Sequence, residues 1–136
     1  MLTDEQRRKL IRKAAAARRQ AYSPYSHYPV GSALLTASGR VFTGVNVENA
    51  AYPTGMCAER VAVFKAVSEG ERDFIAIAVV TSNGGTPCGS CRQVLAEFGL
   101  DTVVLIADAA GHQVMESTVA GLLPGSFGPS DLNDQG

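Results

Sequence analysis

One segment of the sequence, Phe74–Thr81, constrains the fold more than any other, because its first seven residues are all apolar. A continuous apolar run of this length is typical of a strand that is buried on both faces of a sheet. A second such run, Thr102–Ala107, follows after a segment with helical spacing. Strands buried on both faces need covering layers on both sides. The sequence therefore predicts an α/β domain with helices on both faces of one sheet.

The other elements follow from local patterns. The predicted helices cover residues 4–20, 57–68, 89–98 and, as a single turn, 119–123. The predicted strands cover residues 30–37, 40–46, 74–81, 102–107 and, at an edge, 113–115. Thr3 and Gln6 form a capping-box pattern at the start of the first helix. The tail from Pro124 is interpreted as either disordered or docked through Phe127 and Leu132.

Length and charge limit the classes of function. The chain has 136 residues with no repeat or linker, so residues 1–136 are interpreted as a single domain. The net charge of −1 gives no general attraction to nucleic acid or anionic lipid. Seven of the 12 basic residues nevertheless gather in the first helix: Arg7, Arg8, Lys9, Arg12, Lys13, Arg18 and Arg19. A solvated helix face is favoured over a nucleic-acid or membrane patch, because the rest of the chain is acidic in balance.

The compartment is inferred from the N-terminus and the cysteines. No apolar run approaches the ~20 residues that span a bilayer, and charges stand where a signal peptide has its apolar core. We therefore expect a cytoplasmic protein that contacts no membrane. Three cysteines, an odd number, point in that reducing compartment to metal binding or catalysis rather than to disulfides.

The three cysteines lie in two fragments, Cys57-Ala58-Glu59 and Cys88-Gly89-Ser90-Cys91, each at a predicted loop-to-helix junction. A helix N-terminus favours the thiolate, which is the form that binds metal. Three sulfur ligands indicate zinc, and three ligands rather than four are typical of a catalytic site that leaves one position for water. A histidine, His27 or His112, as a fourth ligand is the alternative that stays open.

Two charged residues beside Cys57 bear on the chemistry. Glu59 is close enough in sequence to carry protons for a metal-bound water, although a glutamate in a first helical turn also suits the helix dipole on a solvated surface. Three thiolates around Zn²⁺ leave a net negative charge, so a compensating cation is expected. Arg60 is the favoured candidate and Arg92 the alternative, each with a solvent-facing role as the simpler interpretation.

At these residues the sequence resembles the cytidine deaminase family. The resemblance extends over nearly the whole chain, in the segments PYSHYPVGSALLT (24–36), GVNVENAAYPTGMCAER (44–60), KAVSEG (65–70), PCGSCRQVLAEFG (87–99) and LLPGSFGPSDL (122–132). The short, all-cysteine form is similar to the homotetrameric branch of that family. The resemblance implies a three-layer α/β/α sandwich with a single mixed sheet of about five strands.

The resemblance also implies an activity: hydrolytic deamination of cytidine and 2′-deoxycytidine to uridine and 2′-deoxyuridine plus ammonia, in pyrimidine salvage. Cys57, Cys88 and Cys91 match the ligands of one Zn²⁺ per subunit, and Glu59 matches the catalytic proton carrier. In that chemistry a zinc-activated water attacks C4 of the base, while Glu59 protonates N3 and then the leaving amine.

Seven positions match the substrate pocket of the family: Tyr28, Asn46, Glu48, Tyr52, Ala58, Thr86 and Phe127. Asn46 and Glu48 match residues that bind the ribose hydroxyl, and Tyr28 stands beside the base where the family commonly has Phe. The backbone N–H of Ala58 and the backbone carbonyl of Thr86 are expected to contact the base. The aromatic rings of Tyr52 and Phe127 resemble groups that enter the site of a neighbouring subunit, which implies shared active sites in a homotetramer. Plain packing within one chain is the alternative for both rings.

Three other functions remain as alternatives. A related zinc deaminase acting on an aminonucleoside antibiotic or a modified nucleoside would share the metal site, but the NVEN segment (46–49) and Phe127 suit a ribose and a base better. A nucleic-acid-editing deaminase would need a basic channel, of which only the first helix gives a sign. A non-catalytic zinc module would need a fourth ligand and would tolerate loss of Glu59.

Overall fold

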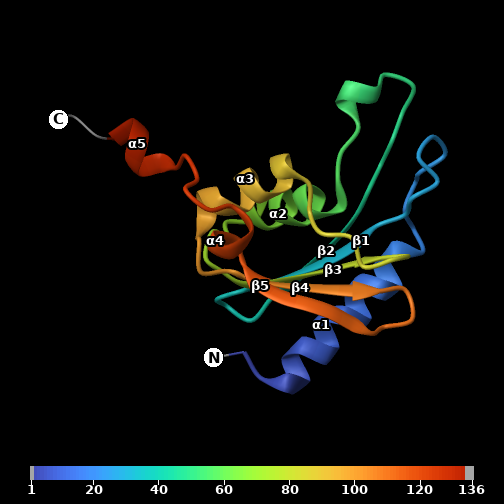
Figure 1. Ribbon diagram of the computed structural model, residues 1–136, viewed down its shortest axis with the longest axis horizontal. Coiled ribbons are helices and arrows are strands. Elements are labelled where there is room, and N and C mark those ends of the chain that lie inside the picture. Colours follow the sequence, from blue (N-terminus) through green and yellow to red (C-terminus); the bar gives the residue numbers. More distant parts are fainter. Residues whose placement is uncertain (1, 134–136) are drawn as a thin grey trace.

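The computed structural model describes residues 2–133, which form one five-stranded sheet with helices on both faces (Figure 1). The strand order is β2-β1-β3-β4-β5, and only β3 and β4 run parallel, so the sheet is mixed. The strands are β1 Gly31–Thr36, β2 Val41–Val45, β3 Phe74–Thr81, β4 Val103–Asp108 and β5 Gln113–Thr118.

Helices form the outer layers. Figure 1 shows α1 on one side of the sheet and α2, α3 and α4 on the other. The helices are α1 Asp4–Arg18, η1 Tyr52–Thr54, α2 Ala58–Ser68, α3 Gly89–Phe98, α4 Val119–Leu122 and α5 Pro129–Asn133. This arrangement confirms the predicted three-layer sandwich with a mixed sheet. No helix in the described part of the chain combines the length and the apolar character needed to cross a membrane.

The central strand β3 divides the core into two clusters, as a two-residue period requires. Ile77 and Val79 pack on one face with buried residues of α2 and α3. Ala76, Ala78 and Val80 face α1 on the other side. All five side chains are at most 1% exposed, so the strand is buried on both faces, as its sequence predicts.

The α1 helix lies very close to β1 because Gly31 has no side chain. A Cβ at Gly31 would lie 2.1 Å from the carbonyl oxygen of Ala14, which no packing tolerates. The helix starts as predicted, since Thr3 and Gln6 form the full capping box. It ends at Arg18, two residues before the predicted end.

Two predictions about the C-terminal part need correction. The edge strand β5 continues to Thr118, three residues beyond the predicted end. Glu116, Ser117 and Thr118 carry no apolar signal, and their pairing with β4 alone makes them a strand. The tail forms α5 instead of an unstructured segment, yet Phe127 is 57% exposed and Leu132 74% exposed. Neither the ring of Phe127 nor the side chain of Leu132 is therefore buried against this chain.

Candidate zinc site

Three sulfur atoms meet where two neighbouring helices begin. Cys57 is the N-cap of α2, Cys88 is the N-cap of α3, and Cys91 lies in the first turn of α3. The Sγ atoms of Cys57 and Cys88 are 3.9 Å apart, those of Cys88 and Cys91 are 3.5 Å apart, and all three lie within 4.8 Å of one another. Sulfurs bound tetrahedrally to zinc at about 2.3 Å are separated by about 3.8 Å. The cluster therefore fits a zinc ion.

The position of α2 depends on two small residues of the sheet. A Cβ at Gly44 in β2 would lie 2.3 Å from the Ala58 carbonyl oxygen, so only glycine lets the start of α2 approach this closely. The hydroxyl of Ser32 in β1 donates a buried hydrogen bond of 2.8 Å to the same carbonyl. These contacts fix the position of the first turn of α2 relative to the sheet, and therefore the positions of Cys57 and Glu59.

Arg60 contacts the sulfur cluster. Its Nη2 donates a hydrogen bond to Cys57 Sγ at 3.3 Å, and its Nε is buried without a hydrogen-bond partner in the described chain. The Cys91 side chain and then the Arg60 guanidinium lower the pKa of Cys57 to about 5, against the opposing effect of burial. The hydrogen bond with Cys57 and burial raise the pKa of Cys91. Cys57 therefore forms a thiolate more readily than Cys91.

Arg92, the other cation considered, does not contact a sulfur. Its Nε donates to the Pro87 carbonyl at 2.7 Å, and its Nη1 donates to the Leu122 carbonyl at 2.6 Å. Its Nη2 donates to Thr86 Oγ1 at 2.9 Å. Arg92 thus ties the loop before α3 to α4, and of the two arginines only Arg60 contacts a cysteine.

Glu59 lies inside the protein and not on its surface. The residue is 4% exposed, although it occupies the first turn of α2, where a solvated glutamate would also be expected. Burial raises the pKa of Glu59 to about 7. A carboxyl group that binds and releases a proton near neutral pH is suited to general acid–base work.

The two histidines take no part in the sulfur cluster. Among the described residues, the group that could hold a metal ion consists of the three cysteines alone. His27 adopts a φ of 55° in the loop before β1, and His112 Nδ1 lies 3.4 Å from an Asp108 carboxylate oxygen. A histidine as fourth ligand is therefore not supported by this structure.

Asn46 and Glu48 organise the loop of residues 21–30. Asn46 is buried, with its Oδ1 accepting from the Val30 N–H at 2.8 Å and its Nδ2 donating to the Tyr28 carbonyl at 3.0 Å. Glu48 Oε1 accepts from the backbone N–H groups of Tyr25 and Ser26, both at 3.0 Å. The Ser26 hydroxyl, which donates to Glu48 Oε2, contributes most to lowering the pKa of Glu48.

The hydroxyl of Tyr28 has a partner that the sequence did not reveal. It donates a hydrogen bond of 2.6 Å to Asn83 Oδ1, in the loop that leads to Thr86. Gly85 is needed beside this bond, because a Cβ there would lie 2.5 Å from the Tyr28 hydroxyl. A glycine two residues after an asparagine is too common in loops to have signalled the contact.

The two outer aromatic residues lie on exposed surface. Tyr52 is 69% exposed and meets the ring of Tyr25 edge-on at 5.3 Å between centroids. Both rings, with Ser26 and Glu48, line an open cavity of about 310 Å³. Phe127 projects from the segment before α5, and its carbonyl accepts from Gln93 Nε2 at 2.8 Å. Neither ring belongs to the cysteine cluster.

Fold and site together define a class of protein. Two helix N-termini over a mixed sheet present three sulfur ligands that fit zinc. The buried carboxyl group of Glu59 follows the first of these ligands, Cys57, by two residues. That set defines the zinc-dependent enzymes whose metal has three protein ligands and an open position for water.

The chain belongs to the cytidine and deoxycytidylate deaminase family. Residues 4–107 match the family described as "Cytidine and deoxycytidylate deaminase zinc-binding region". This match and the geometry of the sulfurs confirm the predicted zinc cofactor.

Several known proteins are similar over almost the full chain. The cytidine deaminase of Halalkalibacterium halodurans is 51% identical over 131 residues, which cover 94% of this chain and 98% of its own. That of Sporosarcina psychrophila is 50% identical, with 92% and 93% covered. The crystal structure of cytidine deaminase from Burkholderia pseudomallei superposes with a TM-score of 0.84 at 45% identity, covering 92% of this chain and 99% of that one. The fold predicted from the sequence is thereby confirmed.

Proposed function

We propose that this protein is a hydrolase that deaminates cytidine and 2′-deoxycytidine to uridine and 2′-deoxyuridine with release of ammonia, as a step of pyrimidine salvage. The observation that carries the proposal is the buried Glu59 directly beside three clustered cysteine sulfurs. The family match and the named relatives support the substrate class, a free nucleoside.

Cys57, Cys88 and Cys91 would hold the zinc ion, which when bound lowers the pKa of water and supplies a nucleophile at neutral pH. Glu59 accepts a proton from the attacking water and donates one to N3 of the pyrimidine, which makes C4 electrophilic. Glu59 then takes the proton of the hydroxyl group now on C4 and delivers it to the amino group. The C4–N bond breaks as the C4 carbonyl forms, so that one water is consumed and one ammonia leaves. Burial keeps bulk water from exchanging these protons.

Arg60 would offset the charge of the three thiolates. Donation of a hydrogen bond to Cys57 withdraws electron density from that sulfur, and so the metal keeps more of its power to acidify water. Without Arg60, the three thiolates and one Zn²⁺ would carry a net charge of −1.

The nucleoside would be held by the loops around the cluster. Asn46 and Glu48 would bind the ribose hydroxyl, because the amide keeps a second N–H and the carboxylate keeps a lone pair beyond their bonds within the protein. Tyr28 would lie against the base. The Ala58 N–H, which lies in the first turn of α2 and has no partner within the helix, would donate to the base, and the Thr86 carbonyl would accept from the amino group.

The active protein would be a homotetramer of single-domain chains, 1–136, in the cytoplasm. The exposed rings of Tyr52 and Phe127 support shared sites. In the tetramer each ring would be buried against a neighbouring copy and would complete the pocket of that copy. Three unpaired thiols within one metal cluster suit a reducing compartment. Light scattering would give the mass of the assembly, and a single calorimetric transition would support one domain.

The test combines zinc content with turnover. The purified protein should contain one zinc per chain, and cytidine should lose its absorbance band as uridine forms. Glu59→Gln should keep the zinc and lower kcat by roughly 10²- to 10⁴-fold, because only the proton transfers are removed. Retention of full turnover by Glu59→Gln would exclude the proposed role, and turnover of a modified nucleoside but not cytidine would change the substrate.

A further inference from the structure

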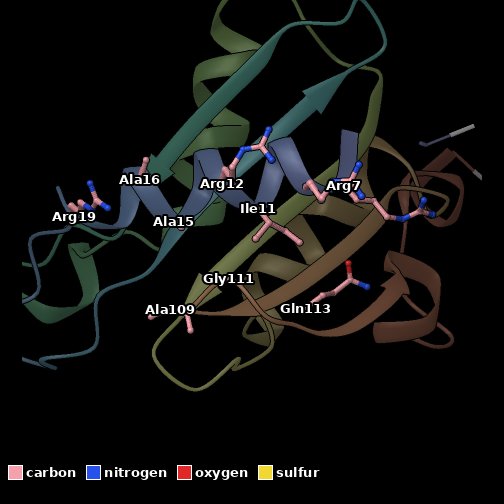
Figure 2. Close-up of a pocket in the computed structure, with 11 residues that line it drawn as sticks. Arg7, Ile11, Arg12, Ala15, Ala16, Arg19, Ala109, Gly111 and Gln113 are labelled. Atoms are coloured by element: carbon pink, nitrogen blue, oxygen red, sulfur yellow. The ribbon is translucent and has the colours of Figure 1, made fainter. Parts of the chain in front are cut away.

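A groove of about 560 Å³ lies beside α1 (Figure 2). The α1 helix covers the face of the sheet opposite to α2 and α3, whose N-termini carry the cysteine cluster (Figure 1). One wall of the groove is the outer side of α1 and the other is the turn between β4 and β5. Its size falls in the range of small-molecule sites. We propose that this groove binds a nucleoside phosphate, at a site separate from the zinc centre.

The positive charge along the groove exceeds its negative charge. Four of its lining residues are Arg7, Arg8, Arg12 and Arg19, and none is acidic. Arg7 is paired from outside the groove with two carboxylates, Glu116 of β5 at 2.8 Å and Asp4 at 3.2 Å. Arg8 and Arg12 share the single carboxylate of Glu5, at 3.0 and 3.6 Å, and together keep one positive charge.

Arg19 is the lining arginine that leaves the groove with a net positive charge, because four arginines face the three carboxylates of Asp4, Glu5 and Glu116. Among the described residues its guanidinium takes part in no ion pair, and Figure 2 shows it at one end of the groove with Arg7 at the other. Charges spread along a groove favour a ligand with several anionic oxygens over a lone carboxylate, and guanidinium groups pair well with phosphate oxygens.

The floor of the groove is apolar. It is made of small side chains and one larger one, with Ile11 and Ala15 on α1 facing Ala109 and Gly111 across the groove in Figure 2. Small residues leave room for a planar ring to lie against the surface. Gln113 at the start of β5 lines the same groove, and its amide offers both a donor and an acceptor to the edge of a base.

Calorimetric titration of the intact protein with ATP tests the proposal, because a purine avoids competition for the pyrimidine pocket proposed above. ATP should bind, and adenosine and inorganic tripolyphosphate should each bind more weakly. Arg19→Gln should weaken ATP binding roughly tenfold or more, since it removes a charge-assisted contact. Ala109→Leu should weaken it by filling the groove without a change of charge.

Arg72→Gln is the matched control, because it removes an exposed positive charge from the loop before β3 and should leave ATP binding unchanged. Lack of ATP binding at millimolar concentration would overturn the proposal. So would equal effects of Arg19→Gln and Arg72→Gln, or tripolyphosphate binding as well as ATP. Far tighter binding of a single-stranded RNA, lost in the same variants, would assign the groove to nucleic acid instead. Cytidine turnover is measured separately and does not enter these outcomes.

Discussion

Arg60 offers a way to separate metal binding from the chemistry that follows it. Its Nη2 donates a hydrogen bond of 3.3 Å to Cys57 Sγ. Arg60→Gln should weaken zinc affinity roughly 10- to 100-fold, because groups that hydrogen-bond to a ligand set the affinity of the metal. Competition with a chromophoric chelator measures the change. Arg60→Lys should recover part of it, whereas unchanged affinity in Arg60→Gln would contradict the proposed role.

The Tyr28–Asn83 bond joins two loops that would carry groups against the base. Tyr28→Phe and Asn83→Ala should each lower the free energy of unfolding by roughly 1 kcal/mol, and the double variant should lose little more than either alone. Denaturant titration of the four proteins gives the coupling energy. Strict additivity would show that the 2.6 Å contact contributes nothing.

These two contacts show what local sequence can and cannot predict. Cysteine ligands at helix starts and a nearby glutamate were predictable, because the spacing within each fragment fixes their relation to one helix. The charge of three thiolates around Zn²⁺ favours Arg60 as the compensating cation, but its contact with a sulfur is seen only in the structure. The partnership of Tyr28 with Asn83 was not, because 55 residues separate them and only the assembled sheet brings their loops together.

At the scale of elements, the distance between α2 and β2 depends on Gly44. Gly44→Ala should lower the free energy of unfolding by roughly 2 to 4 kcal/mol and weaken zinc binding, because the new methyl group would meet the backbone of α2. Gly128→Ala is the control, since a Cβ there has nothing within 4 Å. Thermal unfolding and zinc titration measure both effects. A Gly44→Ala protein of normal stability would contradict this account of the site.

The ion pair between Arg7 of α1 and Glu116 of β5 links a helix to the edge of the sheet. The Arg7 guanidinium holds the pKa of Glu116 below its ordinary value of 4.5. A lowered carboxyl pKa stabilises the fold above the unfolded-state pKa, and this stabilisation is lost as pH falls through the folded-state pKa.

Glu116→Gln should therefore cost up to about 1 kcal/mol at pH 7, a modest value because solvent screens the pair. The difference from the unaltered protein should shrink as the pH falls below 4.5 and vanish once the pH is below the lowered pKa of Glu116. Denaturant titration across this range measures it, with Asp101→Asn before β4 as the control. A difference that grows toward low pH would contradict the assigned sign.

Elements with an apolar period were predictable, and those without one were not. Both bounds of β3 agree with its apolar run, and α3 agrees with its predicted range. β5 exceeds its predicted length because its outer residues are polar and gain their structure from β4. α5 is similar: the Gly128 N–H donates to the Asp131 carboxylate at 2.7 Å, a local bond that the composition of the tail concealed.

At the scale of the whole molecule, the chain exposes the rings of Tyr52 and Phe127 and holds a cysteine cluster that fits zinc. A sequence cannot place a neighbouring subunit, but the exposure of Phe127 makes the shared-site arrangement testable. If each pocket contains Glu59 of its own chain and Phe127 of another chain, two different subunits contribute these residues to one active site. Defects in these two positions should then complement each other.

Glu59→Gln alone should be almost inactive, and Phe127→Ala alone should lose roughly tenfold in kcat/KM through loss of a wall of the neighbouring pocket. When equal amounts are unfolded together and reassembled, a chain with Phe127→Ala keeps its own Glu59 and receives an intact Phe127 from a Glu59→Gln neighbour. Random assembly makes roughly a quarter of all sites complete in this way. The mixture should therefore exceed the mean activity of the two variants severalfold. Activity equal to that mean, from a mixture shown by mass spectrometry to contain mixed assemblies, would place each pocket within a single chain.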